Sequence, residues 1–568
     1  MRQRWAIPVF AITALLLAAL FFVPMGLVIG GGFFHEGRFT LRYLIGVFRN
    51  PVYAEGLLNS LRIALGASAL ATLIALPLAW LSNRFDFPGK RLLGSLILAP
   101  MILPPFVGAI GLQQILGVYG ALNSAMGWGP VDWLGRGRYL GVVLLQALGL
   151  YPILYLNVTA ALANVDPAME EAAENLGCTG LRKFFRITMP LILPGFFAGL
   201  AIVFIWSFTE LGTPLILNYT RCAPVQVFDA LKEIGANPFP YALVFVMLSA
   251  SALLYAAVKL AFGRRAYAMQ SKAATAAVTV RARGARGAAI AAAFAVVLAL
   301  ALLPHLGVVL NSLAAPGSWY RSALPQDFTL SNFAEALGHG MTLRGIRNSL
   351  VYSSLAVGAN LALGLAVAFV VARSTLRARG ALDALAMLPL AVPGLVMAFG
   401  YLALSARVSS QLWVRESPFW QAVFDVRTNP TVFLVIAYAV RRLPYMTRAA
   451  AAGLQQTSVA FEEAAANLGA TPWRTLRRIT LPLISANLVA GALLAFAFSM
   501  LEVSDSLMLA QREDFYPITK TIYELFNVLG TGPYIASALG VWAMAFLAVA
   551  ILGAGRLLGK RMGALFRV

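Results

Sequence analysis

Long apolar runs alternate with short polar segments along this chain. A helix needs about 20 apolar residues to cross a hydrocarbon core roughly 30 Å thick. None of the runs alternates strictly between apolar and polar positions as barrel strands do, so helices are expected to satisfy the backbone in lipid. The pattern predicts an all-α polytopic membrane protein with twelve transmembrane helices. The twelve runs cover residues 5–29, 60–81, 92–116, 139–163, 196–217, 241–262, 288–310, 349–372, 382–404, 432–454, 488–509 and 535–557.

The first run has a charged start, Arg2 and Arg4, as a secretory signal peptide would. Its apolar stretch continues beyond the 7–15 residues of a signal core, and no small-residue cleavage site follows. We interpret it as a retained membrane span.

The net charge of +21 raises the question of a nucleic-acid-binding surface. The basic residues, however, gather in the segments that lie on one side of the membrane when the first span starts inside, including residues 264–287 and the C-terminal tail. This is the positive-inside rule. We therefore expect a lipid membrane and no nucleic acid as partner, with both termini in the cytoplasm.

Much of the chain is repeated. The sequence EEAAENLGCTGLRKFFRITMPLILPG begins at Glu170 and returns as EEAAANLGATPWRTLRRITLPLISAN from Glu462. Six spans per half is an even number, so the halves form a parallel repeat with a pathway expected between them. The domains predicted are a first six-span repeat (1–263, core about 55–262), a basic cytoplasmic linker (264–287) and a second six-span repeat (288–568, core about 345–557). Further matches pair Pro100, Pro104, Gly111 and Glu210 with Pro389, Pro393, Gly400 and Glu502.

Each copy of the motif predicts two short helices across a glycine turn. In the first copy, Asp166 is a helix cap before Pro167, Gly177 ends the helix, and Pro190 opens the next span after a second short helix. The second copy uses Ser458, Gly469, Pro472 and Pro482 in the same way. A loop seated on anionic headgroups through Arg182, Lys183 and Arg186 is the alternative. Two copies at matched positions favour a docking device for a protein partner.

At these residues the chain resembles binding-protein-dependent ABC importer permeases, whose signature loop reads Glu-Ala-Ala, Gly, Ile and a hydrophobic residue before Pro. Only Met189, where Leu is usual, departs from it. The resemblance implies a coupling helix that fits a cleft on a separate ATPase subunit. It further implies a dimer of such ATPases, a periplasmic solute-binding protein and the bacterial inner membrane. The implied docking residues are Glu171, Ala172, Ala173, Gly177, Glu463, Ala464, Ala465 and Gly469.

The chain itself has no P-loop, because Gly89-Lys90 and Gly559-Lys560 are each followed by Arg rather than Ser or Thr. We expect no enzyme activity and no cofactor, with ATP bound by the partner subunit. No metal-ligand cluster is expected either, since the two cysteines and three histidines are scattered.

Among the ionisable residues within the predicted spans, where charges are expensive and usually functional, we single out five. The acids Glu210, Glu502 and Asp505 line a cation path in one interpretation, and are helix-packing or gate residues in the other. Arg441 and Arg442 either form a structural salt bridge to Glu502 or Asp505, or offset negative charge on a substrate.

The substrate remains open at this stage. The fused arrangement is similar to ferric-iron importer permeases, which favours Fe3+, whereas relatives moving thiamine or phosphonates share it. The acids also suit a polyamine, and the arginines suit a phosphonate or another anion. An ion-coupled secondary transporter is the rival class, and an integral-membrane enzyme has little support because no catalytic constellation is visible.

Overall fold

The computed structural model describes residues 2–558 except 36, 102–103, 234–236 and 270–278. Part of the predicted linker and the basic tail beyond residue 558 therefore lie outside the described residues. The described chain is almost entirely helical, as the apolar runs predict. The principal helices are α1 (Arg2–Phe33), α3 (Pro51–Arg84), α5 (Pro105–Leu116), α7 (Tyr139–Ala163), α10 (Met189–Phe208), α13 (Phe239–Met269), α14 (Gly284–Leu313), α16 (Gly340–Arg373), α18 (Gly394–Ser409), α21 (Thr431–Gln456), α24 (Leu481–Met500) and α27 (Gly532–Leu558).

Short elements join these helices. The α-helices among them are α2 (Arg42–Arg49), α4 (Lys90–Leu96), α6 (Ala121–Met126), α8 (Pro167–Asn175), α9 (Gly180–Lys183), α11 (Gly212–Ile216), α12 (Ala223–Asp229), α15 (Ser331–Gly338), α17 (Arg379–Met387), α19 (Leu412–Arg415), α20 (Pro418–Phe424), α22 (Ala460–Asn467), α23 (Pro472–Thr475), α25 (Ser504–Leu509) and α26 (Ile518–Phe526). Irregular helical turns are η1 (Ala99–Met101), η2 (Arg136–Arg138), η3 (Phe184–Thr188), η4 (Ala230–Glu233), η5 (Leu388–Leu390), η6 (Leu476–Thr480) and η7 (Glu513–Phe515). The strands form two short pairs, β1 (Phe34–His35) with β2 (Arg38–Phe39) and β3 (Phe85–Asp86) with β4 (Val280–Arg281).

The prediction of twelve spans agrees with these helices. Among the described residues, ten helical segments are long and apolar enough to cross a membrane, and a bent pair formed by α17 with η5 and α18 provides an eleventh. The twelfth is α21, which is long enough with 26 residues. Its three arginines make it too highly charged to be recognised as a membrane span from composition alone. Since α21 packs between α16 and α24, protein rather than lipid surrounds most of its length. The fold is a polytopic helical membrane protein.

Two spans predicted as continuous are broken. The run at 92–116 splits into α4, η1 and α5, and the run at 382–404 bends by 99° between η5 and α18. Matched prolines lie at both breaks, Pro100 and Pro104 in one half and Pro389 and Pro393 in the other. Proline removes a helical N–H and clashes with the preceding turn, so two prolines close together favour a break, whereas single prolines such as Pro77 and Pro152 lie within continuous helices.

The runs at 196–217 and 488–509 are also broken, at the predicted acids. Glu210 lies between α10 and α11, and Glu502 lies between α24 and α25. Both acids are therefore at helix breaks rather than in the middle of a helix, which corrects the sequence-based placement. Irregular backbone at membrane depth is tolerated where it is buried in protein or lines a cavity.

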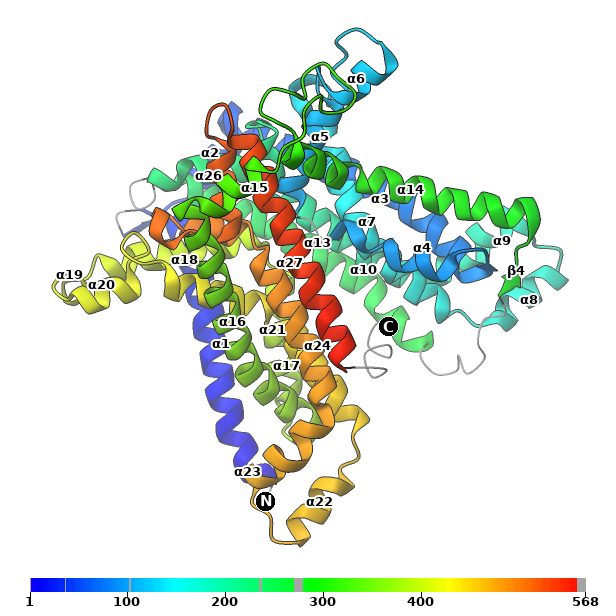
Figure 1. Ribbon diagram of the computed structural model, residues 1–568. Helices are drawn as coiled ribbons and strands as arrows, with labels where there is room; N and C mark the ends of the chain where they lie inside the picture. The colour runs from blue at the N-terminus through cyan, green and yellow to red at the C-terminus, as the bar shows by residue number, and fades with distance from the viewer. Residues whose placement is uncertain (1, 36, 102–103, 234–236, 270–278, 559–568) are drawn as a thin grey trace.

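Figure 1 shows two groups of helices that diverge from a common region near α26 and α15. The helices α8 and α9 lie at the free end of one group, and α22 and α23 lie at the free end of the other. The first helix of each half crosses to the other half: α1 packs against α16, α17 and α18, while α14 packs against α4, α5 and α7. Each half thus helps to build the opposite group.

The crossings occur at the matched glycines Gly111 and Gly400. A Cβ on Gly111 would overlap the backbone of α14 at Pro304, and a Cβ on Gly400 would lie 2.7 Å from the side chain of Met25 and 3.1 Å from Pro24 in α1. The absence of a side chain allows the helices to approach closely, as in other membrane helix pairs. The repeated glycines therefore mark where the two halves interlock.

Candidate functional site

A cavity of about 180 Å³ lies between the two halves. It is lined by the helix breaks of both, including the matched prolines Pro104 and Pro393. Four of the five predicted intramembrane charges line it: Glu210, Glu502, Arg441 and Arg442. The structure thus gathers residues from spans that are far apart in the sequence into one polar site.

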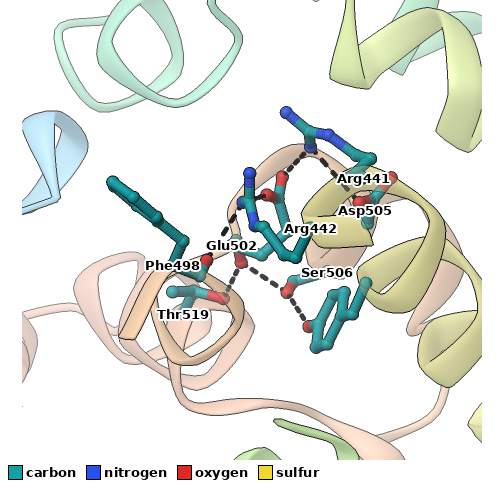
Figure 2. A network of polar contacts seen from close by, with 8 residues as sticks. Arg441, Arg442, Phe498, Glu502, Asp505, Ser506 and Thr519 are labelled. Atoms are coloured by element: carbon teal, nitrogen blue, oxygen red, sulfur yellow. Dashed lines mark hydrogen bonds and ion pairs between the residues drawn. The ribbon is translucent and has the colours of Figure 1, made fainter. Parts of the chain in front are cut away.

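Glu502 is the centre of a buried ion-pair cluster (Figure 2). Arg441 donates to one of its carboxylate oxygens and Arg442 to the other. Arg441 also donates to Oδ2 of Asp505 at 3.3 Å, and Arg442 donates to the carbonyl of Phe498 at 3.0 Å. The side chain of Glu502 is only 6% exposed and that of Asp505 is fully buried. The ion pairs that the salt-bridge interpretation expects for the two arginines are present.

Further hydrogen bonds fix the backbone beneath the cluster. The carbonyl of Glu502 accepts from Ser506 Oγ at 2.5 Å and from Thr519 Oγ1 at 2.6 Å. Ser506 Oγ in turn lies 2.6 Å from the hydroxyl of Tyr438. A buried polar network that is internally bonded in this way is rigid. The chain is therefore held firmly where α24 ends and α25 begins.

Gly394 is a member of this site that was not identified from the sequence. A Cβ at Gly394 would overlap the guanidinium of Arg441. The glycine at the start of α18 thus leaves space for that guanidinium to reach Glu502 and Asp505. The sequence offered one signal for this role: Gly394 directly follows the repeated Pro393, at the position where the first half has Pro105.

Glu210 occupies the matched position in the first half but has different surroundings. Its carboxylate accepts a hydrogen bond from the backbone N–H of Thr213 at 3.3 Å, at the start of α11. Within the described part of the chain, no Lys or Arg nitrogen lies close enough to Glu210 to form an ion pair. The first half has Gly149 and Leu150 where the second has the arginines, so the cavity is electrostatically asymmetric.

The two repeated loops have nearly the same local structure. Asp166 accepts from the N–H of Ala168 at 2.9 Å, as the cap prediction requires, and Ser458 accepts from the N–H of Ala460 at 3.3 Å. Gly177 and the matched Gly469 both have φ of +79°, a left-handed conformation that glycine adopts without strain. The predicted helix and glycine turn are confirmed in both copies.

The exposed faces of α8 and α22 include the second acid of each motif. Glu171 and Glu463 are exposed, as are the adjacent Ala172 and Ala464. The next alanines, Ala173 and Ala465, are buried at 7% and 5% exposure. These buried alanines pack the loop against its own chain, so the expected shallow surface is narrower than the sequence suggests.

The second short helix of each loop is continuous with the span that follows. A π-helical turn, η3 or η6, joins α9 to α10 and α23 to α24, giving helical segments Gly180–Phe208 and Pro472–Met500. The expected separation before Pro190 and Pro482 is therefore wrong. Both prolines lie just after the π-helical turn, where the change in hydrogen-bonding pattern accommodates a missing N–H.

Lys183 is buried and bonded to acids of its own loop. Its side chain is 3% exposed, and its ammonium lies 3.3 Å from Glu170 and 2.6 Å from Glu174. The hydrogen bond and charge of Lys183, with help from Arg84, lower the pKa of Glu174. Sequence analysis missed these intraloop ion pairs, because a basic cluster beside a membrane also fits a headgroup-binding surface.

Comparisons with known proteins agree with the repeat and its motif. A protein family described as the binding-protein-dependent transport system inner membrane component matches residues 67–316 and 360–562. The match occurs twice and covers most of the chain.

Two relatives are similar over both halves. The putative ferric transport system permease protein FbpB 1 of Haemophilus influenzae is 26% identical over 488 residues, which are 82% of this chain and 70% of that protein. The ferric transport system permease protein FbpB of Actinobacillus pleuropneumoniae is 25% identical over 81% of this chain and 64% of that protein. The chain thus spans roughly two thirds of the length of these relatives.

A third relative is similar over part of the chain. The molybdenum transport system permease protein ModB of Escherichia coli is 34% identical over 187 residues, which are 31% of this chain and 80% of that protein. The relatives therefore include transporters named for a metal cation and for molybdenum.

Proposed function

We propose that this chain, which belongs to the family of binding-protein-dependent transport system inner membrane components, carries Fe3+ across the bacterial inner membrane. The family makes it an ABC importer permease. In this proposal two separate ATPase subunits drive transport, and a soluble binding protein delivers the cargo to the outer face. Both termini lie in the cytoplasm. The observation that carries the proposal is the duplicated loop, because it offers two equivalent docking points at the free ends of the two helix groups.

Each docking point combines an exposed carboxylate with a rigid connection to a span. Glu171 and Glu463 are exposed, and each presents a carboxylate to an Arg or Lys of an ATPase subunit. The continuous helices Gly180–Phe208 and Pro472–Met500 would carry a displacement of the loop directly toward the helix breaks that line the cavity. Docking at both loops would therefore couple closure of an ATPase dimer to movement at the cavity.

The charges around the cavity favour a cation as cargo. Arg441 and Arg442 are both bonded to Glu502, so its carboxylate offsets positive charge that would otherwise attract an oxyanion. Glu210 adds a carboxylate with no ion-pair partner among the described residues. The two acids and two bases that line the cavity sum to zero, and Asp505, which is buried and bonded to Arg441, leaves a formal excess of one negative charge at the site, which suits Fe3+ better than molybdate or sulfate.

Transport by the purified assembly tests this assignment. The tagged chain is isolated from its native membrane with the ATPase that co-purifies and is reconstituted in vesicles with the soluble binding protein. We expect ATP-dependent accumulation of radioactive iron and none of molybdate or sulfate. ATP-dependent uptake of an oxyanion without iron would refute the cargo while leaving the importer assignment intact.

A further inference from the structure

The first acid of each repeated motif contacts an arginine at the end of a distant helix. Arg84 is the last residue of α3 and Arg373 is the last residue of α16, and both occupy the same place in the repeat. Arg84 lies 3.8 Å from Glu170, and Arg373 Nε lies 3.0 Å from Glu462. In both halves the loop therefore contacts a helix about 90 residues earlier in the chain, but the hydrogen bond of Arg84 is to Glu174, at 3.2 Å, whereas that of Arg373 is to Glu462.

These contacts divide the roles of the two adjacent acids. Glu170 and Glu462 are partly buried and turn toward their own chain, whereas Glu171 and Glu463 are exposed. Successive residues on a helix point about 100° apart, so one acid can bind within the chain while its neighbour faces outward. The doubled glutamate thus has an inner and an outer member.

We propose that Arg84 and Arg373 are positioning residues that fasten the coupling loops to α3 and α16. The proposal rests on the ATPase-docking role of the loops. Each loop is already joined through the chain to two core helices, α7 and α10 in the first half and α21 and α24 in the second. The Arg–Glu contact adds the third core helix, so a movement imposed on the loop is delivered to all three together.

The packing of α3 and α16 explains why this third attachment matters. In the first half α3 packs along α7 and α10, and in the second half α16 packs along α21 and α24. If the loop were attached only to its flanking helices, those helices could move during a conformational change without moving α3 or α16 by the same amount. With the contact in place, the three helices move as one body.

The two fastenings differ in strength. Arg373 and Glu462 are 5% and 10% exposed, and Arg373 also donates to the carbonyl and hydroxyl of Thr457 at 3.0 and 3.1 Å. Arg84 is 32% exposed and shares Glu170 with Lys183. Exposed ion pairs contribute little and buried ones much more when one partner is removed. Loss of Arg373 should therefore have the larger effect.

Coupling is measured as cargo imported per ATP hydrolysed by the reconstituted assembly, with iron loaded on the binding protein as the probe. For Arg373→Gln we expect this ratio to fall by about tenfold and for Arg84→Gln by about twofold, within the range seen for residues that transmit coupling. ATPase co-purification should persist, because Glu463 still faces outward. Restoration of the ratio in the charge-swapped variant Arg373→Glu with Glu462→Arg would support the fastening.

Arg448→Gln is the matched control. Arg448 forms an ion pair with Asp383 at 3.3 Å between α21 and α17, away from the coupling loops, and its loss should leave the ratio unchanged. A ratio that stays at the wild-type value in Arg373→Gln would overturn the proposal. So would an equal fall in the Arg448 control, because the effect would then not be specific to the loop.

A second measurement uses the chain alone. A spin label at the exposed position Ala466 in α22 reports loop mobility, in a background with Cys178→Ser and Cys222→Ala. We expect an immobile label in the parent chain and a mobile one after Arg373→Gln. An immobile label in both would overturn the fastening even where import fails. A label that is immobile in the parent chain and mobile after Arg373→Gln, without any import, would instead refute the proposed function and leave the fastening supported.

Discussion

Removal of Glu502 should destabilise the protein severely, and removal of one arginine with it should restore most of the loss. The cluster contains two acids and two bases. In Glu502→Met, Arg441 keeps Asp505 at 3.3 Å, whereas Arg442 keeps the carbonyl of Phe498 at 3.0 Å and the ring of that residue at 5.4 Å. One buried guanidinium is then left without a counter-charge.

The magnitude follows from burial. The Arg442 side chain is 9% exposed, and breaking a buried pair by removing one partner costs about 3–5 kcal/mol. The double variant Arg442→Met with Glu502→Met removes both members and leaves Arg441 paired with Asp505. Replacing a buried ion pair by apolar side chains of similar volume is often neutral or stabilising. We therefore expect the double variant to lie within about 1 kcal/mol of the parent.

Thermal unfolding of the purified chain in detergent, at one scan rate, measures the difference between the variants. Glu210→Met is the matched control, because the equivalent carboxylate has no described ion pair and its loss should cost less than about 1 kcal/mol. A Glu502→Met variant as stable as the control would refute the reasoning. So would a double variant less stable than Glu502→Met alone, because the two changes would then not compensate each other.

Three further outcomes are expected. Glu171→Arg combined with Glu463→Arg should release the ATPase in a pull-down, and unchanged co-purification would contradict the docking role. Gly307→Val should lower stability by about 1–3 kcal/mol, because the new side chain would overlap the backbone of α5. Gly358→Ala should not lower stability, because a Cβ there meets no atom within 4 Å. Equal melting temperatures for the two variants would contradict the close crossing. Glu210→Gln should reduce iron import by about tenfold with little loss of stability, if its carboxylate contributes about 1.4 kcal/mol to cation passage; undiminished import would exclude that role.

The repeat made much of the fold predictable. Hydrophobic length identifies the spans, and the second copy of the motif favours a docking loop over an ordinary basic loop. Local signals such as Asp166 and Gly177 were also sufficient to predict where the short loop helix begins and ends, because helix capping depends on neighbouring residues alone.

Breaks within spans and contacts between halves were not predictable in the same way. Hydrophobicity reports whether a segment can lie in lipid, but not whether protein around it tolerates an interrupted helix. The crossing of α1 and α14 to opposite halves depends on close packing at Gly111 and Gly400. The repeat identifies these two glycines but does not show which helix packs against each of them. The contacts of Arg84 and Arg373 with the loops could be found only from the structure, although the sequence shows that the two arginines occupy matched positions in the repeat.

The drive for transport tests the central claim most directly. Vesicles containing the chain, with or without its co-purifying ATPase, are supplied with the iron-loaded binding protein and either ATP or a proton gradient. The account predicts iron uptake only when both the ATPase and ATP are present. Uptake by the chain alone under a proton gradient, without ATP, would contradict it and identify an ion-coupled secondary transporter.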